Sequence, residues 1–210
     1  MRHGESEGNA ARRFQGKSET PLTARGRLQA VTTAETVAAA GPIAAIYASP
    51  LGRALETARA IEAAVGVPVT VEHDLREIDH GVAEGLTWEE LAAAEPEWSE
   101  MLLADTEGLV DPMWPGGELT VSVRERSVRA ARGITSRHNG DTAVLVGHGG
   151  ALTWLIQGLL EPGATARPSY RLRNASLTEI VLRDGAARLV RLDDVAHLDG
   201  QSEYGAGRRR

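Results

Sequence analysis

The sequence contains no cysteine and no long apolar run. Without cysteine the chain has neither disulfide bonds nor thiolate metal ligands. The lack of disulfides is compatible with a protein of a reducing compartment. No stretch reaches the roughly 18 uncharged apolar residues of a membrane-spanning helix, and the first residues lack the apolar core of a secretory signal. We therefore expect a soluble, cytoplasmic protein that does not contact a membrane.

An excess of positive charge is also missing. Lysine and arginine number 23 against 29 acidic residues, which gives a formal net charge of -6. Nucleic-acid binding depends on clustered positive charge, so we expect no nucleic-acid partner, and a local basic pocket must attract any anionic ligand. The basic carboxyl end, residues 205–210, is predicted to be a disordered tail. The other 204 residues are long enough for one core, so we expect a single domain over residues 1–204.

Helical and strand patterns alternate along the chain. Helices are predicted over residues 23–40, 50–65, 118–138 and 149–160, and strands over 43–48, 67–71, 142–147, 176–182 and 186–192. Ser49 and Pro50 are predicted to begin the second helix and Gly66 to end it. Asp184-Gly185 predicts a hairpin turn between the last two strands. We interpret residues of about 85–117, which prolines divide into short helical patches, as a lid over a site.

This alternation predicts an α/β fold. We expect a three-layer α/β/α sandwich, with a mostly parallel central sheet and helices on both faces. In such sheets ligands bind beyond the carboxyl ends of the strands, and His148 directly follows one predicted end.

Two histidines stand in turn-like, glycine-containing segments at opposite ends of the chain. His3 lies between Arg2 and Gly4, and His148 lies within the sequence VGHGG. Glycine allows the main chain to approach an anion closely, and arginine supplies fixed donors for phosphate or carboxylate oxygens. These residues favour phosphate chemistry.

The chain resembles the histidine phosphatase superfamily, in its phosphoglycerate-mutase-like branch 1. Five segments in the family's order carry the resemblance: RHGESEGNAARRFQGKSETPLTARGRLQA (2–30), SPLGRALETA (49–58), LREIDHGVAEG (75–85), PGGE (115–118) and VGHGGAL (146–152). Each segment alone is weak evidence. Together they cover most of the chain at family-like separations.

The resemblance implies a role for each matching residue. His3 matches the nucleophile that carries the phosphoryl group as phosphohistidine, Glu77 matches the general acid and base, and Asp79 and Glu84 remain alternatives for that acid. The catalytic set would be His3, Glu77, His148, Arg2 and Arg53. The phosphate-binding set would be Arg2, Asn9, Gln15, Gly16, Arg53, His148 and Gly149. Outside the motif, Arg53 would be interpreted as a surface arginine and His148 as a buried structural histidine.

The implied activity is that of a phosphomonoesterase, a hydrolase of the histidine acid phosphatase type, acting on a small phosphorylated metabolite. Mutases of the family tend to carry a longer insertion that excludes water, so the compact lid favours hydrolysis. A cofactor-dependent phosphoglycerate mutase and an inactive phosphate-binding or regulatory module remain alternatives. We expect no cofactor and no metal, because no HExxH spacing occurs and Arg2 would repel a cation. Dimers are common among relatives, so we expect a homodimer, although no apolar strip identifies an interface.

One departure from the family concerns the first strand. In the family an apolar strand precedes the RHGE motif, whereas only Met1 precedes it here. We therefore expect a truncated first strand: the true start lies upstream, the chain has been shortened, or the strand is unusually brief. A missing strand would leave sheet edges unpaired, weaken the fold and hold His3 less firmly.

Overall fold

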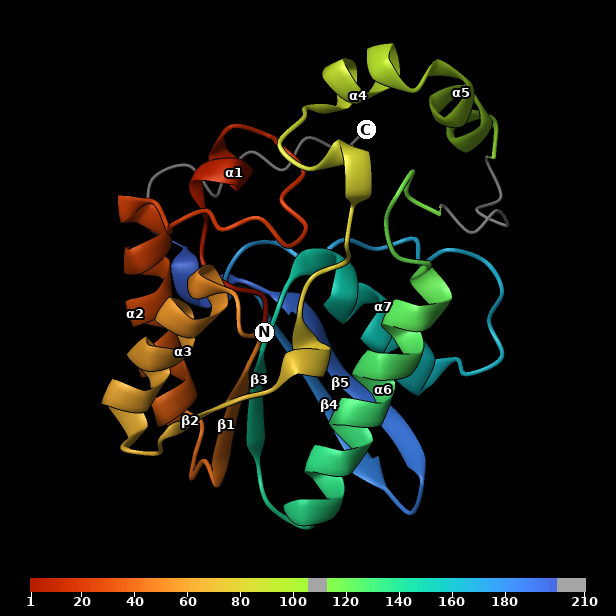
Figure 1. The fold of residues 1–210 in the computed structure, drawn as a ribbon. Coiled ribbons are helices and arrows are strands. Elements are labelled where there is room, and N and C mark those ends of the chain that lie inside the picture. The colour runs from red at the N-terminus through yellow and green to blue at the C-terminus, as the bar shows by residue number, and fades with distance from the viewer. Residues whose placement is uncertain (106–112, 200–210) are drawn as a thin grey trace.

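The computed structural model describes residues 1–105 and 113–199 (Figure 1). The predicted basic tail and part of the predicted lid lie outside these ranges. The helices are α1 Glu7–Ala10, α2 Ala24–Ala39, α3 Gly52–Val65, α4 Trp88–Ala94, α5 Pro96–Ala104, α6 Thr120–Arg137 and α7 Gly149–Leu160, with short 3-10 turns at His73–Leu75, Gly81–Ala83 and Ala196–Leu198. The strands are β1 Ala45–Ala48, β2 Val69–Val71, β3 Ala143–Val146, β4 Leu177–Arg183 and β5 Ala186–Asp194.

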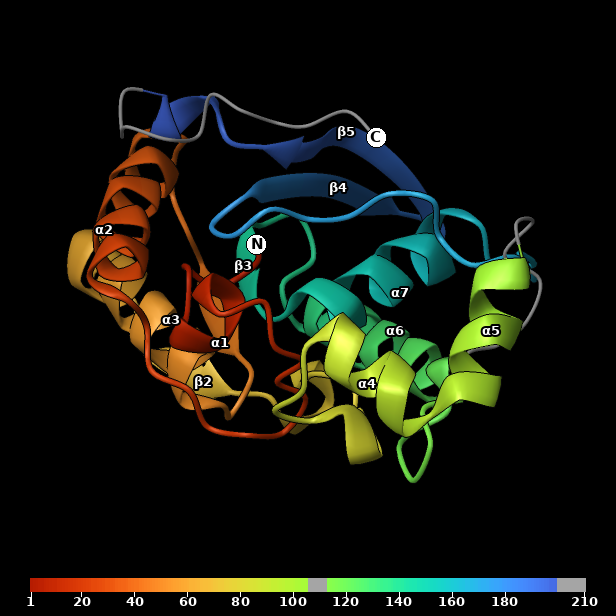
Figure 2. The same cartoon turned by 90° about the horizontal axis from the view of Figure 1, so that it is seen from above.

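A parallel sheet lies at the centre, in the order β2-β1-β3. Its middle strand, β1, is buried along its whole length, as expected for a parallel strand covered on both faces. On one face Ile46 packs with α2 and α3, through Val37 and Ile61. On the other face Tyr47 packs with Ile134 of α6, and α7 lies beside α6 (Figure 2). The predicted α/β architecture is confirmed.

Local capping signals were right at some helix ends and wrong at one. Thr23 caps α2 by accepting a hydrogen bond from the N–H of Gly26, and Gly66 ends α3 with a φ of 74°. The prediction that Ser49 and Pro50 begin the next helix is wrong, because α3 starts at Gly52 without a side-chain cap. The Ser49 hydroxyl instead lies 2.7 Å from Nε2 of His148. The same hydroxyl accepts from the N–H of Leu51 at 3.3 Å, but it does not cap the helix.

The last two strands form a separate antiparallel sheet. β4 pairs with β5, and both turn residues, Asp184 and Gly185, have positive φ values of 52° and 80°. A two-residue turn of this kind matches the twist of the strands it joins. The predicted hairpin is confirmed.

Residues 1–3 link the two sheets. The N–H of His3 donates to Gly147 O at 3.0 Å, and the N–H of Gly147 donates to Met1 O at 3.1 Å, so this segment runs parallel to β3. On its other side the N–H of Arg2 donates to Ser176 O at 3.3 Å, directly before β4. These three residues therefore lie between β3 and the start of β4, where they pair with both neighbours.

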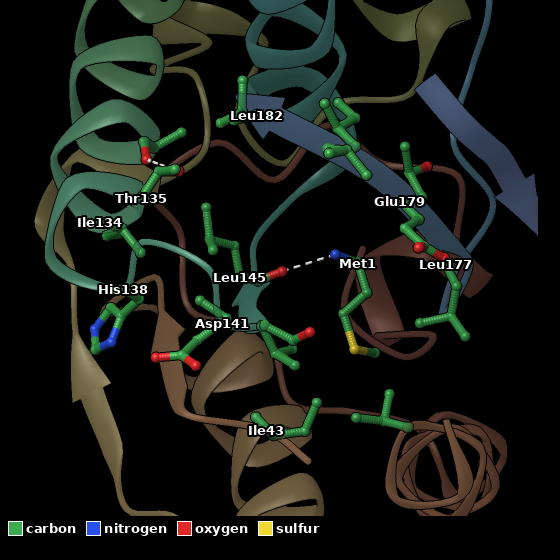
Figure 3. A pocket seen from close by; sticks show the side chains of 18 of the residues that line it. Met1, Ile43, Ile134, Thr135, His138, Asp141, Leu145, Leu177, Glu179 and Leu182 are labelled. Atoms are coloured by element: carbon green, nitrogen blue, oxygen red, sulfur yellow. Dashed lines mark hydrogen bonds between the residues drawn. The ribbon is translucent and has the colours of Figure 1, made fainter. Parts of the chain in front are cut away.

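Beyond Met1, towards the amino end of β3, a cavity of about 620 Å³ separates β3 from β4 (Figure 3). Apolar side chains from both sheets line it, including Leu145, Leu177 and Leu182. The Met1 amino group donates to Leu145 O at 2.7 Å, and burial lowers its pKa from 8.0 to about 5. No pairing joins β3 to β4 among the described strands, so their facing edges lack a partner here.

Candidate active site

His3 and His148 meet at the carboxyl ends of the parallel strands. His3 ends the amino-terminal link, and His148 lies two residues after the end of β3. Their ring centroids lie 5.0 Å apart, with an interplanar angle of 60°. Both side chains are buried, with exposed fractions of 2% and 0%. The structure thus brings together two residues that are 145 positions apart in the sequence, at the end of the sheet where ligands bind in such folds.

The hydrogen bond of His3 fixes its tautomer. Nδ1 lies 2.6 Å from Gly4 O. Because a carbonyl oxygen only accepts, Nδ1 carries the hydrogen, and the lone pair of the neutral ring is on Nε2. Burial lowers the pKa of His3 well below 6.5, and the charges of Arg2 and Arg53 lower it further. At neutral pH the ring is therefore uncharged, with Nε2 available as a nucleophile.

The main chain around His3 is held from three directions. The N–H of Gly4 donates to Oγ1 of Thr57 in α3 at 3.1 Å. The side-chain amide of Asn174 donates to His3 O at 3.2 Å and to Gly4 O at 3.3 Å. Gly4 also lies against α2, since a Cβ atom at Gly4 would be only 2.3 Å from Gly26 O. These contacts leave the backbone of His3 little freedom to move.

Two arginines approach the histidines. Arg2 donates to Leu172 O at 2.6 Å, and its guanidinium group lies against Gly149, at the start of α7. Arg53 is 1% exposed and donates to Ser18 O at 2.8 Å and to Gly16 O at 2.9 Å. Burial lowers the pKa of Arg53, yet guanidinium groups stay protonated in proteins. Both arginines therefore bring positive charge close to the two buried histidines.

Some buried nitrogen atoms at the site have no hydrogen-bond partner among the described residues. They are Nε of Arg53 and Nδ1 of His148. Burial lowers the pKa of His148 well below its ordinary value, and the positive charge of Arg53 lowers it further. Buried polar atoms are normally paired, and unpaired ones require an explanation. Oxygen atoms of a bound phosphoryl group would provide the missing partners.

Glu77 lies at the amino end of α7. Its Oε1 accepts from the N–H groups of Ile78 at 3.0 Å and Ala151 at 2.8 Å, and its Oε2 accepts from Gly150 at 3.2 Å. A helix amino end favours a negative charge through its free N–H groups and its dipole. Oε2, with one long hydrogen bond, is the less engaged oxygen.

The two alternative acids face a different segment. Asp79 forms an ion pair with Lys17 at 2.5 Å, and Glu84 accepts from the N–H of Lys17 and the hydroxyl of Ser18. Both carboxylates thus stabilise the loop at residues 16–18. Glu77 instead binds the N–H groups of Gly150 and Ala151, just after His148, and this position favours it among the three candidates.

The remaining predicted phosphate-binding residues form a network beside His3. Oδ1 of Asn9 accepts from the N–H of Ser6 at 3.2 Å and from the side-chain amide of Asn174 at 2.9 Å, so its own amide N–H groups point elsewhere. The side-chain oxygen of Gln15 accepts from Ser6 at 2.7 Å and from Thr20. Gly16, with a φ of 51°, presents its carbonyl oxygen to Arg53. Gln15 and Gly16 therefore support their neighbours, and direct phosphate contact by either residue stays a prediction.

Half-buried aromatic rings connect the α4–α5 segment to the loop that follows Glu77. The ring of Trp114 lies 4.4 Å from His80, 5.1 Å from Phe14 and 5.1 Å from Trp98, measured between centroids. α4 and α5 lie above the carboxyl ends of the parallel strands (Figure 1). This placement agrees with the expected lid, whose residues 106–112 lie outside the described ranges.

Sequence reasoning missed two residues that touch the site. Ser49 lay in a recognised motif, but its pattern indicated a helix cap. Asn174 gave no signal, since nothing in the segment RLRNAS marks it. Ala175, which follows it, is a buried residue with a φ of 58°, and such strained backbone tends to occur near functional sites.

Within residues 1–105 and 113–199, no group of three or more histidine, aspartate or glutamate side chains is arranged to hold a metal ion. No helix in the same part of the chain is long and apolar enough to cross a bilayer.

Comparison with known proteins identifies one family and several relatives. Residues 1–195 match the model of the histidine phosphatase superfamily, branch 1. The chain is 37% identical over 204 residues to a probable phosphoglycerate mutase, GpmB, of Salmonella paratyphi B, which covers 95% of this chain and 93% of the relative. Among solved structures, Bacillus stearothermophilus YhfR superposes with a TM-score of 0.84 at 30% identity, covering 94% and 96% of the two chains. A mycobacterial glucosyl-3-phosphoglycerate phosphatase in complex with VO3 gives 0.79 at 31%, covering 90% and 94%.

Proposed function

Since the chain belongs to branch 1 of the histidine phosphatase superfamily, we propose that it hydrolyses a small phosphomonoester through a phosphohistidine intermediate. The relatives include both phosphatases and probable phosphoglycerate mutases. Membership of this family thus supports the proposal that the chain is an enzyme acting on phosphoryl groups.

The environment of His3 is the observation on which this proposal depends. Its ring is neutral and its Nε2 lone pair is available, and it lies beside the charges of Arg2 and the buried Arg53 and beside the ring of His148. A neutral imidazole is a competent nucleophile towards phosphorus, and fixed positive charge stabilises the charge that develops on the phosphoryl oxygens.

The proposed reaction has two steps. Nε2 of His3 attacks the phosphorus, the bond to the ester oxygen breaks, and Glu77 gives that oxygen a proton. Water then attacks the phosphohistidine, Glu77 takes up a proton from it, and the P–N bond breaks to release inorganic phosphate. Arg2, Arg53 and His148 would stabilise the phosphoryl oxygens in both steps.

Hydrolysis of p-nitrophenyl phosphate tests the proposal. We expect His3→Ala to lower kcat by at least about 10³-fold, because no other group replaces the nucleophile. His73→Ala, which removes an exposed imidazole from the loop preceding Glu77, serves as the matched control and should keep full activity. Wild-type protein quenched during turnover should carry an acid-labile phosphate. Full activity of His3→Ala would refute the mechanism.

A phosphoglycerate mutase is the second candidate, because the relative with 37% identity is named a probable member of that class. The two activities share the first step and differ in the acceptor of the phosphoryl group. Incubation of 3-phosphoglycerate with a trace of 2,3-bisphosphoglycerate separates them. Isomer formation faster than phosphate release would favour the mutase, and phosphate binding without either reaction would favour an inactive binding module.

A further inference from the structure

We propose that Arg126 is a positioning residue for the proposed reaction: from within α6 it fixes the main chain that carries Glu77, and thereby sets where the proton reaches the leaving group. The inference rests on the proposed function and adds a residue that does not itself touch the substrate.

Arg126 is an arginine buried behind the Glu77 loop, with an exposed fraction of 4%. Its Nη1 donates to the carbonyl oxygens of Asp74 at 2.7 Å and Arg76 at 2.8 Å, and its Nη2 donates to Glu77 O at 3.2 Å. One side chain thus binds three carbonyl groups within four residues of chain. Glu77 itself is one of them.

The same guanidinium group also binds the PGGE segment. Its Nε donates to Oε1 of Glu118 at 2.9 Å, and its Nη2 donates to Oε2 at 3.0 Å. All five N–H groups of the guanidinium are therefore engaged. Only arginine offers this planar five-donor arrangement, and lysine cannot reproduce it.

Glu118 also binds the main chain that follows Glu77. Its N–H donates to Asp79 O at 2.9 Å, and the N–H of Val82 donates to Pro115 O at 3.0 Å. The fit is close, because a Cβ atom at Gly117 would lie 2.3 Å from Asp79 O. Burial raises the pKa of Glu118, but the hydrogen bond and charge of Arg126 outweigh it and lower the pKa overall, so the ion pair persists.

Glu77 is consequently held at both ends. Arg126 holds its carbonyl oxygen, and the start of α7 holds its carboxylate. A side chain with few rotatable bonds and a fixed backbone reaches a narrow range of positions. Proton transfer requires hydrogen-bond distance to the leaving oxygen, so a loosened backbone reduces the transfer even though the acid is present.

If the ion pair between Arg126 and Glu118 only stabilised the fold, its loss would have a different effect on the kinetics. Loss of folding stability alone lowers the amount of active enzyme and affects all substrates equally. Loss of acid positioning affects substrates according to their leaving group. p-Nitrophenolate leaves with little help from a proton, whereas an alkoxide requires one.

The test compares p-nitrophenyl phosphate with glycerol 1-phosphate in four proteins: wild type, Glu77→Gln, Arg126→Lys and the double variant. We expect Arg126→Lys to lower kcat for the alkyl ester about tenfold more than for the aryl ester, in the same direction as Glu77→Gln. The double variant should be no slower than Glu77→Gln alone, since both changes act on one group. Thermal melting verifies that Arg126→Lys is folded, and Glu118→Gln, which retains arginine, should give a smaller shift of the same kind.

Arg129→Lys is the matched control. Arg129 lies one turn further along α6 and binds the side chain of Asp74 at 3.1 Å, but it is exposed to solvent. It should leave the ratio of the two rates unchanged. Equal losses on both esters in Arg126→Lys, or losses that multiply with Glu77→Gln, would overturn the inference. Absence of hydrolysis by the wild type would instead refute the proposed function.

Discussion

Gly150 occupies the second position of α7, where its missing side chain makes room for Glu77. A Cβ atom at this position would lie 2.8 Å from Oε1 of Glu77 and 2.7 Å from Cδ1 of Ile78. Glycine lowers helix propensity by about 1 kcal/mol relative to alanine. The helix therefore gives up intrinsic stability at the position that receives the carboxylate.

For Gly150→Ala we expect separate effects on stability and activity. Both crowded atoms are side-chain ends rather than backbone, and alanine raises helix propensity, so we expect a change in the free energy of unfolding within about 1 kcal/mol. The displaced Glu77 should lower kcat on alkyl phosphates by about tenfold or more. Urea unfolding and steady-state kinetics measure the two quantities. Unchanged kinetics would show that the place of this carboxylate does not matter.

The residues of the candidate site differ in how far sequence could predict them. His3, Arg53, Glu77 and His148 stand in recognisable motifs, and the structure places them around the carboxyl ends of the strands. Asn174 supports His3 from 171 positions away, and Arg126 supports Glu77 from another helix. Such contacts between distant segments leave no local pattern, so only the folded structure reveals them.

Helix α2 packs closely against the main chain that follows the nucleophile. Gly26, in its first turn, faces the segment that follows His3, and a Cβ atom there would lie 1.9 Å from Glu5 O. Here the obstruction is backbone, which cannot rotate away. The glycine lets α2 pack directly on the segment that carries the reactive histidine.

Two glycine substitutions in different helices should consequently have opposite effects. Gly26→Ala should destabilise the protein by about 1–3 kcal/mol, because the added methyl group overlaps main-chain atoms. Gly133→Ala in α6 should stabilise it by roughly 0.5–1 kcal/mol, since the nearest atom to its Cβ is a flexible arginine end at 3.6 Å. Chemical denaturation of both variants measures the difference. Equal shifts would contradict the packing argument.

The helices and strands were predictable wherever one pattern dominated. The apolar run at β3 and the turn signal before β5 gave elements of the right kind, and the boundaries differ by a few residues. The short helix α1 escaped prediction, because four residues carry too little periodicity to detect. The start of α3 was misplaced because the hydroxyl of Ser49 binds His148, which lies almost one hundred positions away and leaves no local signal.

Across the whole molecule, burial of uncharged histidines links stability to pH. His3 and His148 have pKa values well below 6.5 in the folded chain, through burial first and neighbouring charge second. The unfolded chain takes up these protons near the ordinary pKa. Below that pH the unfolded state therefore binds more protons than the folded state, and acid favours unfolding. The buried Met1 amino group, with its pKa lowered from 8.0 to about 5, acts in the same direction.

We expect the free energy of unfolding to decrease as the pH falls from about 7 to about 5, by up to 1.4 kcal/mol per pH unit for each buried histidine. Urea unfolding at several pH values measures the slope. His148→Gln should reduce it, whereas His73→Gln, at an exposed position, should leave it unchanged. A stability that rises on acidification would refute this account.

Residues 1–3 combine two tasks that most folds assign to different segments. They contain the imidazole proposed to receive phosphorus, and they carry main-chain hydrogen bonds from the parallel sheet to the β4–β5 hairpin. A displacement of the hairpin would therefore shift the main chain that carries the reactive nitrogen, because both are joined by the hydrogen bonds of residues 1–3. A change that weakens the junction between the two sheets should therefore also displace His3 from its position in the site.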